Sequence, residues 1–180
     1  MSFSLIAEAI GFVAFLFLLF SSQSKTREKI LFNQLISSLI FIIHFGLLSA
    51  WTGVVMNLLI VFRNYIFIKK PKYAWAQHIG WLFLFIFLTL TLTALSWEGY
   101  ISILPAFAVA AGTYGRWLSR PFTIRFISLF FGVLLWLPYT ILVGSYSGTA
   151  AQIAIGIAIV YGMFKHDSLK ETLLKNKIAP

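Results

Sequence analysis

Two carboxamide side chains interrupt long apolar stretches at matching places in the chain. Asn57 ends the stretch "LLSAWTGVVMN" and Gln152 ends "LVGSYSGTAAQ", so a shift of 95 residues places one amide on the other. Each amide carries two donors and an acceptor, and a lipid surrounding supplies no water to satisfy them. We therefore expect both amides to face other helices or a cavity, where they suit a hydroxylated or amide-bearing ligand better than a metal ion. The alternative, that they only hydrogen-bond neighbouring helices, stays open.

An aromatic residue precedes each amide by 16 positions. These residues are Phe41 and Trp136, and the shift of 95 residues relates them as well. Both are expected on the helix before the amide, where a flat ring can stack on a sugar or another ring.

Three further polar residues are candidates for a proton-coupling or gating role: His44, Tyr139 and Asn64. The same shift relates His44 to Tyr139. A histidine titrates near neutral pH and can couple protons to transport, although a simple hydrogen bond is the alternative. Asn64 lies seven residues after Asn57, so both project to one helix face. For Arg63 we expect the guanidinium to reach the lipid headgroups along its apolar stem, with an inner-gate role as the alternative.

The other chemistry-bearing residues do not form a catalytic set. Intramembrane hydrolysis needs paired carboxylates, a serine with a base, or metal ligands at helical spacing. The acids are Glu8, Glu28, Glu98, Asp167 and Glu171, and the histidines are His44, His78 and His166. They are scattered over different segments, and the glycines show no phosphate-binding spacing. The sequence predicts neither an enzyme nor a bound metal or cofactor.

The elements that must position these residues are apolar spans. Of 180 residues 60% are hydrophobic and only 11% are charged, which is typical of a polytopic membrane protein. Polar breaks divide the chain into seven predicted transmembrane helices: 3–21, 30–48, 51–68, 79–96, 99–115, 126–143 and 147–164. At 1.5 Å per residue each is roughly 26–30 Å long, enough to cross a bilayer core.

The basic residues indicate how these helices are oriented. All 14 Lys and Arg residues lie at or after the ends of the first, third, fifth and seventh spans. The positive-inside rule then predicts an external N-terminus and a cytoplasmic C-terminus. Because the net charge of +9 is spread over short loops and a tail beside apolar helices, we expect it to serve topology and anionic lipid, with no nucleic-acid partner.

The 95-residue shift extends beyond the amides and indicates an internal repeat. It also places Gly53 on Gly148 and Trp51 on Tyr146. An odd linker helix gives two three-helix units the same orientation, so they are parallel repeats. The predicted division is 1–68 for the first repeat, 69–98 for the linker helix, 99–164 for the second repeat and 165–180 for a cytoplasmic tail.

Two resemblances follow from these patterns. The run "QLISSLIFIIHFGLLSAWTGVVMNLLIVFRN", together with "LLWLPYTILVGSYSG", resembles bacterial inner-membrane proteins of the YgjV type, from about Ile10 to Phe164. That resemblance implies an inner-membrane location. The 3+1+3 organisation is similar to SWEET (PQ-loop) carriers, which place an aromatic on the second helix and an asparagine on the third helix of each unit. The likeness implies that Phe41, Asn57, Trp136 and Gln152 line a pocket, although Phe replaces Trp and Gln replaces Asn in this chain.

Together these observations favour an all-α membrane protein that moves a small neutral polar solute by rocking of the two repeats. The alternative is a non-transporting membrane module that binds a partner or lipid through its exposed aromatic residues. The expected partners are the bilayer and the solute, with a second copy of the chain as a further option.

Overall fold

The computed structural model describes residues 3–118 and 120–166, and this part of the chain is helical without strands. Its longer helices are α1 (Phe3–Gln23), α2 (Arg27–Leu47), α3 (Trp51–Lys69), α5 (Gly80–Leu95), α6 (Ile103–Trp117) and α9 (Tyr146–His166). Its shorter elements are α4 (Ala74–Gln77), η1 (Tyr100–Ser102), α7 (Pro121–Ile127), the π-helical segment η2 (Ser128–Val133) and α8 (Leu134–Leu142). The predicted all-α class is confirmed for the described residues.

Within residues 3–118 and 120–166, five helices are long and apolar enough to cross a membrane: Leu5–Gln23, Arg27–Leu47, Trp51–Lys69, Pro121–Leu142 and Tyr146–Phe164. The range 121–142 is continuous because α7, η2 and α8 follow one another without a break. Helix α5 is apolar but has only 16 residues, and α6 has 15. The count of seven spans and the orientation of the termini therefore stay predictions.

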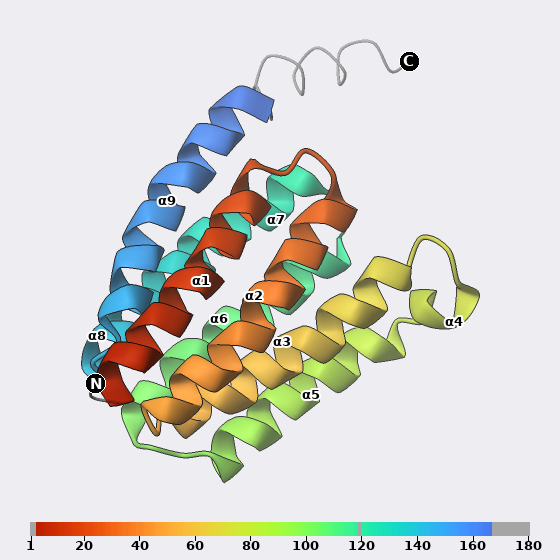
Figure 1. Cartoon of the computed structure of the whole chain (residues 1–180). Coiled ribbons are helices and arrows are strands. Elements are labelled where there is room, and N and C mark those ends of the chain that lie inside the picture. Colours follow the sequence, from red (N-terminus) through yellow and green to blue (C-terminus); the bar gives the residue numbers. More distant parts are fainter. Residues whose placement is uncertain (1–2, 119, 167–180) are drawn as a thin grey trace.

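The helices surround a common centre (Figure 1). Neighbouring helices α1, α2 and α3 pack side by side, and α6 packs against η2 and α8, which in turn pack against α9. Two further contacts close the ring, because α1 packs against α9 and α3 packs against α6. Helix α5 packs on the outside, against α3 and α6. Small residues allow the close approach of α1 to its neighbours: Ala7 and Ala14 are fully buried, and Gly11 lies against the His44 ring.

The turns α2–α3 and α8–α9 have the same backbone conformation. Ser49 (φ 55°) and Gly144 (φ 72°) both lie in the left-handed region, and they are 95 residues apart. In both turns the next residue donates its N–H to the carbonyl oxygen five residues earlier, at 2.9 Å. These are the bonds that satisfy the free carbonyls at a helix C-terminus.

Predicted and observed boundaries differ mainly at two places. The break after α3 contains the short helix α4, which the sequence did not predict. The sixth segment begins at Pro121 and not at residue 126, because proline is well suited to the first turn of a helix. The predicted division into repeats, linker and tail is not tested by these contacts, and most of the tail, 167–180, lies outside the described residues.

Contacts between loops define two ends of the bundle. At one end, Lys70 Nζ donates to the carbonyl oxygen of Trp117 and Lys72 pairs with Glu28. We call this the basic end; it holds the connections α1–α2, α3–α4 and α6–α7. The opposite end holds the connections α2–α3, α5–η1 and α8–α9. Between the two ends, the outer surface carries many large apolar side chains, including Phe12, Phe83 and Ile157.

Candidate functional site

A cavity of about 130 Å³ lies inside the ring of helices. Residues from α1, α2, α3, α6, α7, η2, α8 and α9 line it, whereas α5 contributes none of its lining. The π-helical segment matters here because Ser128, Gly132 and Val133 all belong to the lining. Short π-helical segments inside α-helices are frequent at functional sites.

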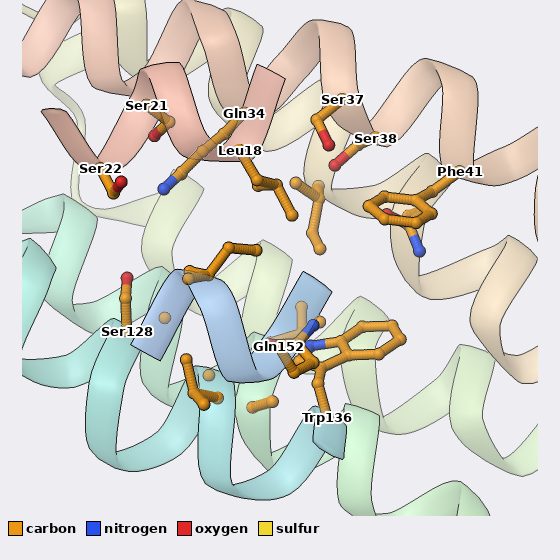
Figure 2. Close-up of a pocket in the computed structure, with 18 of the residues that line it drawn as sticks. Leu18, Ser21, Ser22, Gln34, Ser37, Ser38, Phe41, Ser128, Trp136 and Gln152 are labelled. Carbon is orange, nitrogen blue, oxygen red and sulfur yellow. The ribbon is translucent and has the colours of Figure 1, made fainter. Parts of the chain in front are cut away.

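All four residues predicted to line a pocket border this cavity: Phe41, Asn57, Trp136 and Gln152. Figure 2 shows Phe41 on one side and Trp136 and Gln152 on the other. The Asn57 side chain is buried, and its Nδ2 donates to the carbonyl oxygen of Gly53 at 2.9 Å. The Gln152 side chain is half-buried and has no hydrogen bond to the described residues. The structure thus brings the four side chains together, while their role in binding a substrate stays a prediction.

Phe45 is a lining residue that the sequence reasoning missed. Its ring stacks on Phe41, with centroids 5.6 Å apart, and on Trp136, with centroids 5.9 Å apart. The three rings form a continuous aromatic wall from α2 to α8. The spacing of four between Phe41 and Phe45 was the available signal, since residues at i and i+4 share a helix face.

Arg63 also lines the cavity, and the expectation that it reaches the headgroups is wrong. Its side chain is only 1% exposed. The guanidinium turns toward α6, where Nη1 donates to Thr113 Oγ1 at 3.1 Å and to the carbonyl oxygen of Val109 at 3.4 Å. The packing of α3 against α6 therefore holds this cation inside the bundle.

Two more arginines, Arg116 and Arg125, belong to the lining. From the sequence, both were expected in the loop between the fifth and sixth spans, where basic residues set the membrane orientation, but they lie in α6 and α7. Arg116 Nε donates to Gln34 Oε1 at 2.8 Å, and Arg125 is 2% exposed with Nη2 donating to the Ser24 carbonyl oxygen at 2.7 Å. No sequence signal separates an inward arginine from one at the headgroups, because both lie near helix ends.

His44 is fully buried near the opposite end and connects α2 to two other segments. Its Nδ1 is 2.7 Å from the carbonyl oxygen of Ala7, and its Nε2 is 2.7 Å from Ser145 Oγ. A carbonyl oxygen can only accept, so Nδ1 carries a hydrogen and donates to Ala7, while Nε2 is hydrogen-bonded to the Ser145 hydroxyl. Ser145 Oγ in turn accepts from Gly148 N at 3.0 Å.

Tyr139, the counterpart of His44 in the shift of 95 residues, makes an analogous contact. Its side chain is fully buried, and its hydroxyl oxygen accepts from Gly53 N at 2.8 Å. Each of the two residues thus bonds to the start of a helix that is distant in the sequence. A proton-coupling or gating role for His44 and Tyr139 stays a prediction.

Asn64 is buried, but it is not among the described residues that line the cavity. Its Oδ1 accepts from Arg63 Nε at 3.2 Å and from Nη2 at 3.1 Å, and its Nδ2 is 3.4 Å from the carbonyl oxygen of Leu31. Asn64 therefore orients the Arg63 guanidinium. A direct gating role for it also stays a prediction.

Comparison with known proteins identifies the class to which this arrangement belongs. Residues 5–170 match the Imp-YgjV family, described as "Bacterial inner membrane protein". The chain belongs to this family. The predicted resemblance to YgjV-type proteins and the predicted inner-membrane location are confirmed, and the apolar helices of this Imp-YgjV protein contact the lipid bilayer. No curated protein and no solved structure matches the chain, so the likeness to SWEET carriers stays a prediction.

In this Imp-YgjV protein the described residues include no group of three or more His, Asp or Glu side chains able to hold a metal ion. What the cavity does offer is a set of neutral amides and aromatic rings, with three arginines toward the basic end.

Proposed function

We propose that this inner-membrane protein transports a small solute by alternating access, with the central cavity as its binding site. The observation that carries the proposal is the symmetry of the cavity lining. The following pairs, each 95 residues apart, both line the cavity: Ser21 and Arg116, Ile30 and Arg125, Ser37 and Gly132, Ser38 and Val133, Phe41 and Trp136, Phe45 and Thr140, Asn57 and Gln152, Ile60 and Ile155. A cavity built from equivalent positions of two units is the arrangement expected of a transporter made of repeats.

The packing supports two equivalent units around the cavity, in a 3+1+3 order. The shift of 95 residues relates α1 to α6, α2 to the segment 121–142, and α3 to α9. It therefore converts the contact between α1 and α9 into the contact between α6 and α3, and both contacts are present. The matching turns at Ser49 and Gly144 fit the same relation. Helix α5, outside the ring, takes the place of the linker.

The buried contacts of His44 and Tyr139 support rocking about one end of the bundle. The His44–Ser145 contact joins α2 to the turn before α9, and the Tyr139–Gly53 contact joins α8 to the start of α3. In both contacts the two residues come from different proposed units. A conformational change that opens this end has to break both contacts, which makes them a natural gate.

The orientation that we propose has the basic end in the cytoplasm, the N-terminus outside and seven transmembrane segments. The alternation of basic and non-basic connections supports it. Exposed aromatic side chains at both ends support it too, because Trp and Tyr favour the membrane interface: Trp51, Trp97 and Tyr146 lie at the opposite end, and Tyr73 and Trp75 at the basic end.

We further propose that the solute is moved without chemical change. Each acid in the described residues has a structural partner at the ends of the bundle. Glu8 accepts from the first backbone N–H groups of α9, Glu98 accepts from those of α3, and Glu28 pairs with Lys72. Carboxylates at helix N-termini stabilise the helix dipole and complete its hydrogen bonds.

Thiol labelling tests the transport proposal directly, because the chain has no cysteine of its own. Asn57→Cys and Gln152→Cys place a thiol in the cavity from each proposed unit. Leu58→Cys and Ile153→Cys are matched controls on the same helices, since both native side chains are outward and large parts of them are exposed, 44% and 54%. A membrane-impermeant methanethiosulfonate is applied to right-side-out and to inside-out vesicles.

We expect both cavity positions to react from either side, because each side gains access in turn, whereas the lipid-facing controls stay unreactive. Asn57→Ala or Gln152→Ala should also reduce uptake of the solute. Reaction of the cavity thiols from one side only would contradict alternating access. No reaction from either side would favour the alternative of a non-transporting membrane module, as would a partner that co-purifies in fixed ratio.

A further inference from the structure

Three arginines, Arg63, Arg116 and Arg125, line the cavity toward its basic end. Arg63 and Arg125 are almost completely buried, and Arg116 is half-buried. A guanidinium stays charged in a protein under all ordinary conditions. The lining therefore carries three positive charges.

Arg63 and Arg116 approach one another at Gly112. A Cβ on Gly112 would lie 2.5 Å from Nη1 of Arg116 and 3.7 Å from Nη1 of Arg63, so the glycine leaves room for both guanidinium groups. The two positive charges beside Gly112 repel each other, and the repulsion grows as water is removed. An arrangement that brings them together needs a compensating partner.

The partners of these two cations in the described residues are neutral. Arg63 donates to the Asn64 amide, to a hydroxyl and to a backbone carbonyl oxygen. Arg116 donates to Gln34 Oε1, to the Gly112 carbonyl oxygen at 2.9 Å and, at 3.5 Å, to Ser128 Oγ. Neutral acceptors satisfy hydrogen bonds and orient the groups, but they do not cancel charge. A buried cation without a counter-ion costs several kcal/mol of solvation free energy.

The described part of the chain offers no anion to this cavity. None of the acids there belongs to the lining. Glu8 and Glu98 bind helix N-termini at the opposite end, and Glu28 lies at the surface with Lys72. For Arg63 and Arg116, a bound anion would supply the compensating charge.

We propose that the cavity binds an oxyanion, a phosphate or carboxylate group, at Arg63 and Arg116, and that the rest of the ligand lies toward Trp136 and Gln152. This inference rests on the proposed function in taking the cavity as the solute site, and it replaces the neutral solute expected from the amides alone. The planar guanidinium donates two parallel hydrogen bonds to the oxygens of a carboxylate or phosphate group. These charge-assisted hydrogen bonds are stronger than those to a neutral solute. The aromatic wall of Phe41, Phe45 and Trp136 suits an organic part.

A thermal-stability assay on the purified full chain tests this inference. The protein is kept in a neutral detergent without phosphate, and benzoate, benzamide, phenyl phosphate and inorganic phosphate are added separately. A ligand that binds the folded state raises the unfolding temperature. We expect benzoate and phenyl phosphate to bind at least about tenfold more tightly than neutral benzamide, because hydrogen bonds to charged groups are the stronger ones. Equal binding of benzoate and benzamide, or no response to any anion, would overturn the inference.

Variants separate a ligand role of the arginines from a structural one. Arg63→Gln and Arg116→Gln should weaken anion binding about tenfold or more, while Arg116→Lys keeps the charge and should weaken it less. Arg120→Gln is the matched control, because Arg120 lies at the same end of the bundle, is exposed and does not line the cavity. Without anion, the Gln variants should unfold at the wild-type temperature or above it. A lower unfolding temperature with an unchanged response to anions would show a purely structural role and overturn the inference.

Two further arms identify the source of the oxyanion and separate this inference from transport. The rise in unfolding temperature caused by inorganic phosphate is measured in nanodiscs of phosphatidylcholine, with and without phosphatidylglycerol. If the natural ligand is a lipid headgroup, phosphatidylglycerol occupies the site and abolishes this rise. If the natural ligand is a free solute, the rise is the same in both kinds of nanodisc. Both results support the oxyanion site. In proteoliposomes, anion binding without uptake supports the inference and contradicts transport. Uptake of a neutral solute that Arg63→Gln and Arg116→Gln leave unchanged supports transport and overturns the inference.

Discussion

The contact between Tyr139 and Gly53 allows a quantitative prediction about how the two sides of the ring are held together. Gly53 is the third residue of α3, so its backbone N–H has no carbonyl partner four residues earlier within the helix. The Tyr139 hydroxyl oxygen is its acceptor, at 2.8 Å, and both residues are buried. Tyr139→Phe keeps the ring and removes only the hydroxyl group that accepts from Gly53 N.

The expected cost follows from the group that is left behind. A buried donor without an acceptor costs about 1–3 kcal/mol, and the ring contacts of Tyr139 with Phe45 and Trp136 remain. We therefore expect Tyr139→Phe to lower the free energy of unfolding by about 1–3 kcal/mol. The denaturant dependence should not change, because the variant exposes no new surface on unfolding.

Equilibrium unfolding in mixed micelles of a mild detergent and increasing dodecyl sulfate, followed by far-ultraviolet circular dichroism, measures this change. Tyr146→Phe is the matched control, since Tyr146 lies at the same end and is 81% exposed. It should change the stability by less than about 0.5 kcal/mol. A Tyr139→Phe variant as stable as the wild type would refute the reasoning, because Gly53 N would then have another acceptor.

Two other substitutions test the packing by the same unfolding measurement. Gly162→Ala should destabilise the protein by about 1–3 kcal/mol, because its Cβ would lie 2.9 Å from a backbone oxygen of α1, which cannot turn away; a neutral effect would contradict the close approach of α9 to α1. Glu98→Gln should cost about 0.5–1 kcal/mol, since the carboxylate accepts from the first two N–H groups of α3. Glu28→Gln, which loses only an exposed ion pair, is its control and should have the smaller effect.

Much of the fold was predictable from the sequence because a bilayer restricts the choices. Backbone polar groups in lipid must bond within the chain, so long apolar runs become helices. The predicted breaks at residues 22–29 and 49–50 agree with the observed turns to within a few residues for this reason. The π-helical segment and the helix α4 were not predicted, since no simple residue pattern marks either of them.

The candidate site was predictable where polarity and spacing coincide. Asn57 and Gln152 conflict with their apolar surroundings, and one shift relates them, so the sequence by itself predicts that they occupy equivalent faces. Phe41 and Trp136 follow from the same shift. All four line the cavity because each lies on the inner face of a ring helix.

Only the tertiary structure decided the electrostatic character of that cavity. Arg63, Arg116 and Arg125 occur near helix ends, where a long side chain can extend to the headgroups or turn inward. Whether such a side chain turns inward depends on the rotation of its helix and on hydrogen-bond acceptors that are distant in the sequence, such as Thr113 for Arg63. Likewise, His44 meets Ser145 across 101 residues, a pairing that follows from the closed ring and not from local sequence. The sequence therefore determined most of the helical segments and singled out Asn57 and Gln152, the two amides related by the shift of 95 residues, whereas the packing of the helices decided which charges they enclose.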